Sequence, residues 1–124
     1  MRFAKVTFWI AGIYGLIVLT PLYFLFDQVG LRQPPAITHP EYYYGFVGVG
    51  LAWQLAFLVI ATNPARYRLL ILPSIFEKFS YAVAVYTLFA QHRIASQAVA
   101  FGSVDGLLGV LFVAAYFAVK PQND

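Results

Sequence analysis

The chain has no cysteine, and only 10% of its 124 residues are charged. Without cysteine there are no disulfide bonds, no thiolate nucleophiles and no cysteine-ligated metal sites. Soluble domains carry about 25% charged residues, so the scarcity of charge argues against a soluble protein. Hydrophobic residues make up 61% of the sequence, compared with about 45–50% in soluble domains. The composition therefore indicates a membrane protein, and the length suits one domain.

Most of the chain falls in four long apolar segments. These segments are residues 6–26, 44–62, 69–90 and 98–119. Each approaches or exceeds the ~20 residues that a helix needs to cross a bilayer. Arg2 and Lys5 precede the first segment as in a signal peptide, but that segment is longer than the roughly 7–15 apolar residues of one, so we interpret it as a retained helix. The sequence predicts an all-α fold, a four-helix transmembrane bundle that forms a single membrane domain over residues 1–124.

The basic residues are distributed unevenly between the two predicted sides of the membrane. With four spans, both termini lie on one side, together with Arg2, Lys5, Arg66, Arg68, Lys78 and Lys120. The opposite side carries Arg32 and Arg93. Because cytoplasmic loops are enriched in Lys and Arg, we expect both termini to be cytoplasmic. These charges fall at the ends of predicted helices, so we do not expect the protein to bind nucleic acid.

The start of the second helix and the course of the third have local signals. Thr38 and Glu41 have the S/T-x-x-E spacing of a capping box, with His39 and Pro40 between them. Proline is well tolerated in the first turn of a helix, so this segment is expected to begin the second helix. Pro73 is expected to kink the third helix.

Small residues recur at helical spacing in three of the predicted spans. The residues concerned are Gly12 and Gly15, then Gly45, Gly48, Ala52 and Ala56, then Gly102, Gly106 and Gly109. Small residues let helix backbones approach closely inside a membrane. We therefore expect a compact bundle with glycine-rich contact faces. The glycines lie within apolar spans and do not resemble a nucleotide-binding loop.

Glu77 is an ionisable residue inside the third predicted span, where charge is costly and is often functional. Helical spacing places Tyr81 on the same face, and Gln54 in the second span lies at a depth from which it can reach Glu77. The adjacent Lys78 is expected to point elsewhere and to extend to the cytoplasmic interface. Two interpretations stay open, a structural polar clamp between Glu77 and Gln54 or a site for a ligand or a proton.

Asp105 in the fourth predicted span is the second intramembrane acid. Arg93, or His92 at the end of the third helix, is expected to pair with it across the adjacent turn; the alternative is a site for a solute, a quinone head group or a proton. His39 and His92 lie at helix ends, so a haem, pigment or metal site is not expected. No catalytic constellation such as Ser-His-Asp spacing or HExxH is present, which favours a protein that is not an enzyme.

Three segments carry a resemblance to a family. They are His39-Pro40-Glu41-Tyr42-Tyr43-Tyr44-Gly45-Phe46, Glu77-Lys78-Phe79 and Asp105-Gly106-Leu107-Leu108-Gly109-Val110-Leu111-Phe112. The chain resembles DoxX-like small four-span membrane proteins of bacteria, more in architecture than in motif. The resemblance implies the bacterial cytoplasmic (inner) membrane and roles linked to membrane redox and quinones, often as a partner of other subunits. It makes Glu77 and Asp105 the candidate residues.

Two functions are compatible with these features. We expect an accessory or scaffolding subunit of a larger membrane complex, because the predicted loops are short and the helices present glycine faces. Its partners would be membrane lipids and another membrane protein or further copies of the chain. The alternative is a membrane-embedded protein that binds a quinone or another hydrophobic solute, with redox coupling, because two intramembrane acids lie among aromatic residues.

Overall fold

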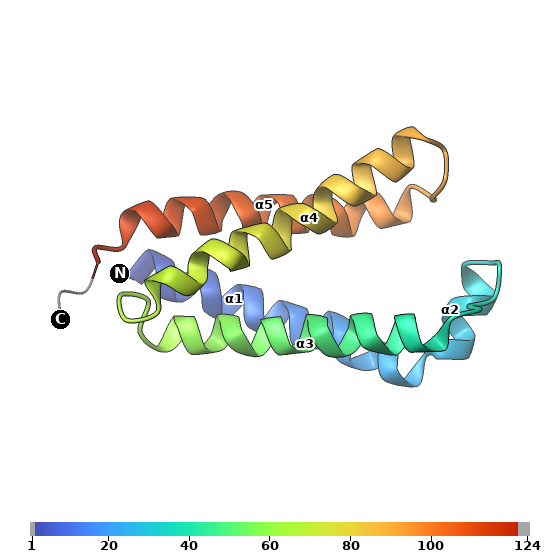
Figure 1. The fold of residues 1–124 in the computed structure, drawn as a ribbon, viewed down its shortest axis with the longest axis horizontal. Helices are drawn as coiled ribbons and strands as arrows, with labels where there is room; N and C mark the ends of the chain where they lie inside the picture. The colour runs from blue at the N-terminus through green and yellow to red at the C-terminus, as the bar shows by residue number, and fades with distance from the viewer. Residues whose placement is uncertain (1, 122–124) are drawn as a thin grey trace.

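In a computed structural model that describes residues 2–121, most of the chain is helical (Figure 1). No strand occurs in this part of the chain, which confirms the predicted all-α class. The elements are α1 (Arg2–Leu19), the 3₁₀ helix η1 (Thr20–Phe24), α2 (Phe26–Arg32), α3 (Pro40–Thr62), the 3₁₀ helix η2 (Arg68–Leu70), α4 (Ile71–Ala90) and α5 (Gln97–Ala118).

Four helical segments are long and apolar enough to cross a membrane. They are Arg2–Phe24, Pro40–Thr62, Arg68–Ala90 and Gln97–Ala118, each 22 or 23 residues long. At 1.5 Å per residue such a segment extends about 33 Å, which matches the ~30 Å hydrocarbon core of a bilayer. The predicted number of four membrane-length apolar helices is therefore confirmed for the described residues.

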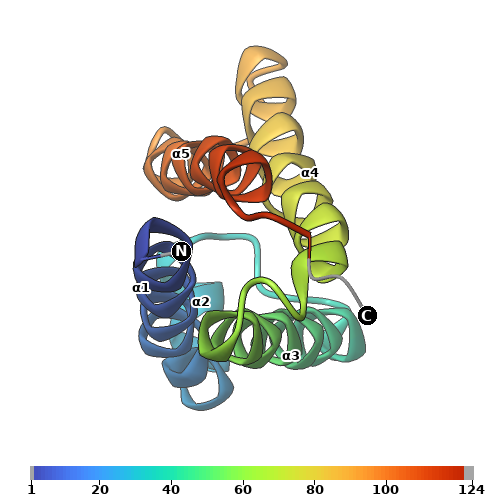
Figure 2. The ribbon, with the colours of Figure 1, turned by 90° about the vertical axis from the view of Figure 1, so that its left-hand side faces the viewer.

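The four long helices form two antiparallel pairs. α1 packs along α3, and α4 packs along α5 (Figure 2). α1 also contacts α5, whereas α3 and α4 contact each other only over a short stretch. The two pairs lie close together at the end that holds the start of α1 and the end of α5, and they diverge toward the opposite end (Figure 1). The molecule therefore has a closed end and an open end.

An aromatic cluster occupies the closed end. Phe8 of α1 stacks on Phe112 of α5 with ring centroids 4.3 Å apart, and Phe57 of α3 meets Phe112 edge-on at 5.0 Å. All three side chains are fully buried. Such offset and edge-to-face pairs are favourable beyond the area that they bury. The cluster therefore joins the two helix pairs, since it takes residues from both.

Arg68 attaches the turn between α3 and α4 to the end of α5. Its Nε atom donates to the carbonyl oxygens of Tyr116, at 3.1 Å, and Val119, at 2.9 Å. Its guanidinium carbon lies 3.8 Å from the centroid of the Tyr116 ring. Cations are favoured at helix C-termini, where carbonyl groups lack intrahelical partners. Arg68 thus satisfies the end of α5 and holds the closed end together.

The glycine faces are used inside each helix pair. A Cβ atom added at Gly12 of α1 would lie 2.6 Å from Leu58 Cδ2 and 2.9 Å from the backbone oxygen of Gln54 on α3. In the other pair, a Cβ atom at Gly109 of α5 would lie 2.9 Å from the Phe79 ring of α4. Glycine at these positions allows close helix contact, as the small-residue pattern predicts.

The capping box predicted at the start of α3 is wrong. The N-cap of α3 is His39 and not Thr38, and no side chain hydrogen-bonds to the exposed amides of the first turn. Because the cap is one residue later, Glu41 stands one position too early to close a box. Its carboxylate instead lies 3.8 Å from the His39 ring, with both side chains exposed. Pro40 occupies the first turn, as expected, where its missing N–H leaves no hydrogen bond unmade.

Candidate functional site

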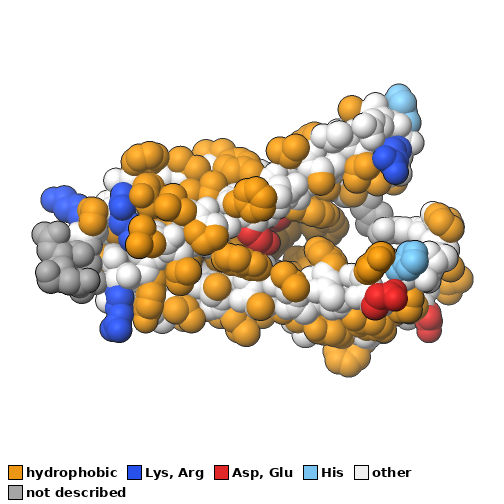
Figure 3. All heavy atoms as spheres, viewed as in Figure 1, with side chains coloured by type: hydrophobic (Ala, Val, Ile, Leu, Met, Phe, Trp, Pro, Cys, Tyr) orange, Lys and Arg blue, Asp and Glu red, His pale blue; other side chains and the backbone are white. Residues whose placement is uncertain are grey.

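A cavity of about 270 Å³ lies between the two helix pairs. We call it the cleft. On α1, α3 and α5, the residues that line it lie between the aromatic cluster and the open end. Acidic side chains are visible within this hollow, and apolar side chains surround it (Figure 3). The cleft is lined by Tyr14, Gly15, Val18, Leu19, Leu22, Phe46, Gly50, Gln54, Glu77, Lys78, Tyr81, Phe101 and Asp105.

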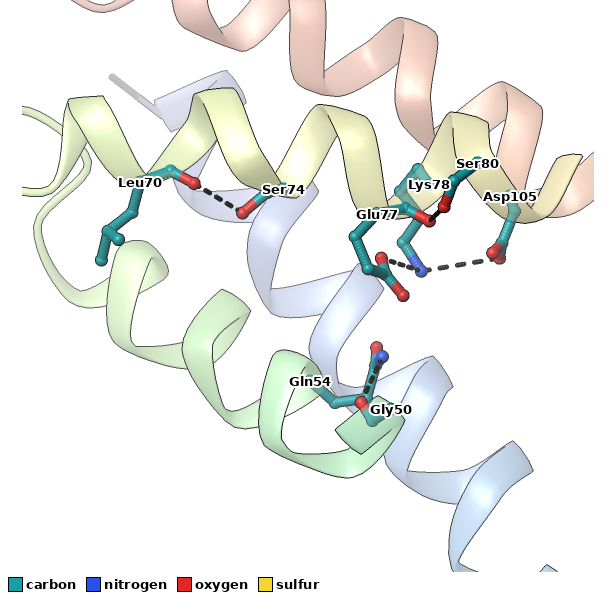
Figure 4. Close-up of polar contacts among 8 residues, drawn as sticks. All are labelled: Gly50, Gln54, Leu70, Ser74, Glu77, Lys78, Ser80 and Asp105. Atoms are coloured by element: carbon teal, nitrogen blue, oxygen red, sulfur yellow. Dashed lines mark hydrogen bonds and ion pairs between the residues drawn. The ribbon is translucent and has the colours of Figure 1, made fainter. Parts of the chain in front are cut away.

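Lys78 lies between the two intramembrane acids. Its Nζ atom is 3.6 Å from Glu77 Oε2 and 3.5 Å from Asp105 Oδ1, and its side chain is only 3% exposed (Figure 4). The same Nζ atom lies 5.0 Å from the centroid of the Phe57 ring. We call Glu77, Lys78 and Asp105 the charged cluster. When all three side chains are ionised, the charged cluster has one positive and two negative charges.

The expectation that Lys78 extends to the membrane interface is wrong. Adjacent helical residues differ by about 100° in direction, but the side of α4 that faces α5 and the cleft is wide enough to accept both Glu77 and Lys78. The flexible lysine stem lets the ammonium group turn toward the carboxylates. In a low-dielectric environment, the attraction of two nearby acids favours this buried position over the interface.

Asp105 has a different partner from the one that the sequence suggests. Arg93 and His92 are both exposed and follow α4 at the open end, and neither lines the cleft. Asp105 lies eight residues beyond Gln97, the first residue of α5, which corresponds to about 12 Å along the helix axis. The predicted latch from the turn to Asp105 is therefore wrong, because the aspartate lies too deep in the bundle, next to Lys78.

Gln54 is buried in the cleft wall, with 2% of the residue exposed. Its Nε2 atom donates to the carbonyl oxygen of Gly50 at 2.9 Å, within its own helix. The predicted hydrogen bond from Gln54 to Glu77 is not formed; the two side chains face each other across a gap (Figure 4). Gln54 Oε1 and Glu77 Oε2 are both buried without a hydrogen-bond partner among residues 2–121.

Aromatic side chains form much of the rest of the cleft wall. Tyr81 lines it from the same helix as Glu77, as its spacing suggests. Tyr14, Phe46 and Phe101 add rings from α1, α3 and α5. These three residues and Gly50 carry no signal in the sequence, because an aromatic residue or a glycine in an apolar span is too common to indicate a site. Only the arrangement of the helices brings them together.

The two histidines lie away from the cleft. His39 is the N-cap of α3, and His92 stands in the turn after α4 with a positive φ of 59°. Within the described chain, no group of three His, Cys, Asp or Glu side chains could hold a metal ion. The charged cluster contributes two carboxylates but holds a lysine ammonium group between them. This ammonium group occupies the place that a metal ion coordinated by both carboxylates would need.

These features define a multi-pass helical membrane protein with a charged cluster in a cleft between its helices. Large apolar side chains cover the outside, and Phe76 and Phe117, for example, are 74% and 77% exposed. Exposed apolar surface on membrane-length helices is the arrangement that lipid contact requires. No family model, curated protein or solved structure that was compared with the chain matches it.

Proposed function

We propose that this protein binds a small amphiphilic molecule inside the membrane. The polar group of the ligand would lie against the charged cluster and Gln54, and its apolar part would occupy the remainder of the cleft. The observation that carries the proposal concerns two buried oxygens beside a cavity of about 270 Å³: Gln54 Oε1 has no hydrogen-bond partner in the described chain, and Glu77 Oε2 has only its 3.6 Å ion contact with Lys78 Nζ. A buried polar atom without a partner costs free energy, and a ligand that bonds to both oxygens removes that cost.

The composition of the cleft supports the same proposal. Small-molecule sites are mostly apolar cavities in which a few polar groups converge, often between the helices of a bundle. Here the polar groups come from α3, α4 and α5, and the apolar wall includes aromatic rings from all four long helices. Helix packing alone does not call for the charged cluster, because Gly102 and Gly109 already bring α5 close to α4.

Filling the cleft should prevent binding. We expect the Val18→Trp variant to lose its bound amphiphile, because the indole would occupy the cavity that Val18 lines. The measurement is mass spectrometry of organic extracts from the protein, purified in lipid nanodiscs. Val83→Trp is the matched control, because Val83 is 62% exposed on the outer surface of α4. Equal extracts from the two variants, with no compound reduced in Val18→Trp, would contradict the proposal.

A role as an accessory or scaffolding subunit has weaker support. The glycine faces that suggested docking are used inside the helix pairs, as at Gly12, Gly102 and Gly109. The feature that favours a docked helix is Gly45 of α3, where an added Cβ atom would have no neighbour within 4 Å. A partner membrane protein or a second copy of the chain would have room to approach α3 at this position.

We further propose that the membrane is a bacterial inner membrane and that both termini are cytoplasmic. Lys and Arg side chains gather at the closed end, and the opposite end carries both histidines (Figure 3). With Lys78 inside the bundle, five basic residues remain for the proposed cytoplasmic side, namely Arg2, Lys5, Arg66, Arg68 and Lys120, against Arg32 and Arg93 for the other. This excess is the support for the orientation.

The absence of cysteine allows a direct test of this orientation. Gln91→Cys and Lys120→Cys each introduce the sole thiol of the chain, at exposed positions near opposite ends of the molecule. We expect a membrane-impermeant maleimide to label Gln91→Cys on intact bacterial cells and to label Lys120→Cys only after the inner membrane is permeabilised. The reverse labelling pattern would overturn the proposed orientation.

Pro73 is the third residue of α4, so we place the predicted change of direction between η2 and the span that follows it. The resemblance to DoxX-like proteins would make a quinone head group one occupant of the cleft, in its reduced quinol form, whose hydroxyl groups can donate to Gln54 Oε1 and Glu77 Oε2. The support for that occupant is the proximity of Glu77 and Asp105, through Lys78, at the cavity wall.

A further inference from the structure

Some polar atoms of the cleft already have a hydrogen-bond or ion-pair partner, and others do not. Gln54 Oε1 is an acceptor with no hydrogen-bond partner in the described chain, and Glu77 Oε2 makes no hydrogen bond there but lies 3.6 Å from Lys78 Nζ. Two donors of the cleft are already engaged, because Gln54 Nε2 bonds to the Gly50 carbonyl and Lys78 Nζ lies between two carboxylates. The Tyr14 and Tyr81 hydroxyls, which also line the cleft, can either donate or accept. A complementary ligand therefore brings hydrogen-bond donors.

The charge of the cleft is also unbalanced. Glu77 and Asp105 are its two acids, and Lys78 is its one base. The other described lysines and arginines are absent from the cleft wall. An uncompensated charge is costly in a low-dielectric site, and an opposite charge beside it reduces that cost. A ligand with a single positive charge would neutralise the ionised cluster, whereas a neutral ligand would leave it with a negative charge.

The aromatic wall favours the same kind of ligand. Tyr14, Phe46, Tyr81 and Phe101 line the cleft and belong to α1, α3, α4 and α5 respectively. Ring faces attract ammonium groups, and this attraction is stronger in sites that exclude water. They also pack well against an apolar ring. The volume of about 270 Å³ is close to the lower end of the ~300–1,000 Å³ range of small-molecule sites, so the cleft suits a compact ligand.

We infer that the ligand is a compact lipophilic amine in its protonated form; this inference rests on the proposed function. Its ammonium group donates to Glu77 Oε2 and Gln54 Oε1 and balances the charge of the cluster. Its apolar portion lies among the aromatic rings. A neutral amphiphile such as a quinol would also supply hydrogen-bond donors, but it would leave the negative charge of the cluster unbalanced.

Two probes of equal length isolate the charge. 4-Phenylbutylamine carries an ammonium group at pH 7, whereas 4-phenylbutan-1-ol has the same chain and a neutral donor. Binding is measured by equilibrium dialysis against the protein in nanodiscs, and protein-free nanodiscs of the same lipid give the partitioning background. We expect the amine to bind at least about tenfold more tightly than the alcohol, since the favourable charge interaction acts in a low-dielectric site.

Two variants remove one negative charge each while nearly keeping side-chain shape. Glu77→Gln and Asp105→Asn should each bring the two probes to within about threefold of each other, because a cluster with one acid is already neutral. The controls are Glu41→Gln and Asp27→Asn, the same substitutions at exposed acids near the open end. Both controls should keep the preference for the amine. The two cleft variants are independent, so one that fails to fold leaves the other to test the inference.

The outcomes separate this inference from the proposed function. If the alcohol binds as tightly as the amine or more tightly, and Val18→Trp abolishes the binding of both probes, the amine inference is overturned. The cleft would then be a site for a neutral amphiphile. An amine preference that persists in both Glu77→Gln and Asp105→Asn also overturns the inference, because the charge would then lie elsewhere. If neither probe binds, the amine inference fails, and the extract comparison of Val18→Trp with Val83→Trp decides the proposed function separately.

Discussion

Replacing Lys78 with methionine is expected to lower the free energy of unfolding by about 3–5 kcal/mol, the usual cost of removing one partner from a buried ion pair. Methionine has a similar length and fits an apolar environment, so the main loss is the positive charge. Glu77 and Asp105 would then face each other across the helix pair with no cation beside them. The measurement is reversible unfolding in mixed detergent–SDS micelles, followed by circular dichroism.

Two variants control for other effects of this substitution. Lys5→Met makes the same exchange at an exposed residue near the closed end and should change stability little. The triple variant Glu77→Gln, Lys78→Met and Asp105→Asn removes all three charges and should recover most of the stability, because no unpaired charge remains. If Lys78→Met unfolds at the same SDS fraction as Lys5→Met, the lysine is not held between the two acids.

The helices were predictable from the sequence because they depend on local composition. Each span is an apolar segment of nearly bilayer length, and the length requirement is the same for every helix in a membrane. The ends were less predictable. α3 begins at Pro40, four residues before the apolar segment at 44–62, because Glu41 and the tyrosines that follow it continue the helix although they are not aliphatic. Helix termini depend on backbone geometry that hydropathy does not report.

The partners that the sequence suggested for the candidate residues differ from those in the structure. Glu77, Asp105 and Gln54 all line one cleft. Helical spacing gives only the direction in which a side chain leaves the helix, and by that criterion Lys78 points away from Glu77. The structure differs because lysine has four rotatable side-chain bonds and can turn back toward an acid. Likewise, Arg93 is close to Asp105 in sequence but lies at the end of the bundle, whereas Lys78 lies at the same depth.

The cleft itself had no signal in the sequence. Glycine positions predict that helices approach closely, and they do so within each pair, at Gly12 and Gly109. They contain no information on the angle between one pair and the other. That angle follows from the aromatic cluster and Arg68 at the closed end, together with the limited contact between α3 and α4. Such long-range packing depends on residues more than forty positions apart in the chain.

The second large effect is expected at Gly12, where substitution with alanine should destabilise the pair of α1 and α3. The new Cβ atom would lie 2.6 Å from Leu58 Cδ2 and 2.9 Å from the Gln54 backbone oxygen. The leucine side chain can rotate away, but the backbone oxygen moves only if α3 moves. Overpacking of this kind typically costs about 1–3 kcal/mol, and the measurement is the same SDS unfolding.

Gly45→Ala is the matched control for this prediction. It makes the same exchange within a membrane-length helix, and its Cβ atom would have no neighbour within 4 Å. Alanine favours a helix over glycine by about 1 kcal/mol at both positions, so Gly45→Ala should be neutral or stabilising. The difference between the two variants therefore measures the contact between α1 and α3. If Gly12→Ala is as stable as Gly45→Ala, the helices do not approach closely at this position.

Gly12→Ala should also weaken the binding of 4-phenylbutylamine in the cleft. Gln54 reaches into the cleft from the segment of α3 whose backbone oxygen faces Gly12. A shift of that segment by a few tenths of an ångström also displaces Gln54 Oε1, which is buried at the cleft wall. Binding of 4-phenylbutylamine should therefore fall in Gly12→Ala and stay unchanged in Gly45→Ala. Unchanged amine binding in a destabilised Gly12→Ala protein would mean that Gln54 makes no contact with the ligand.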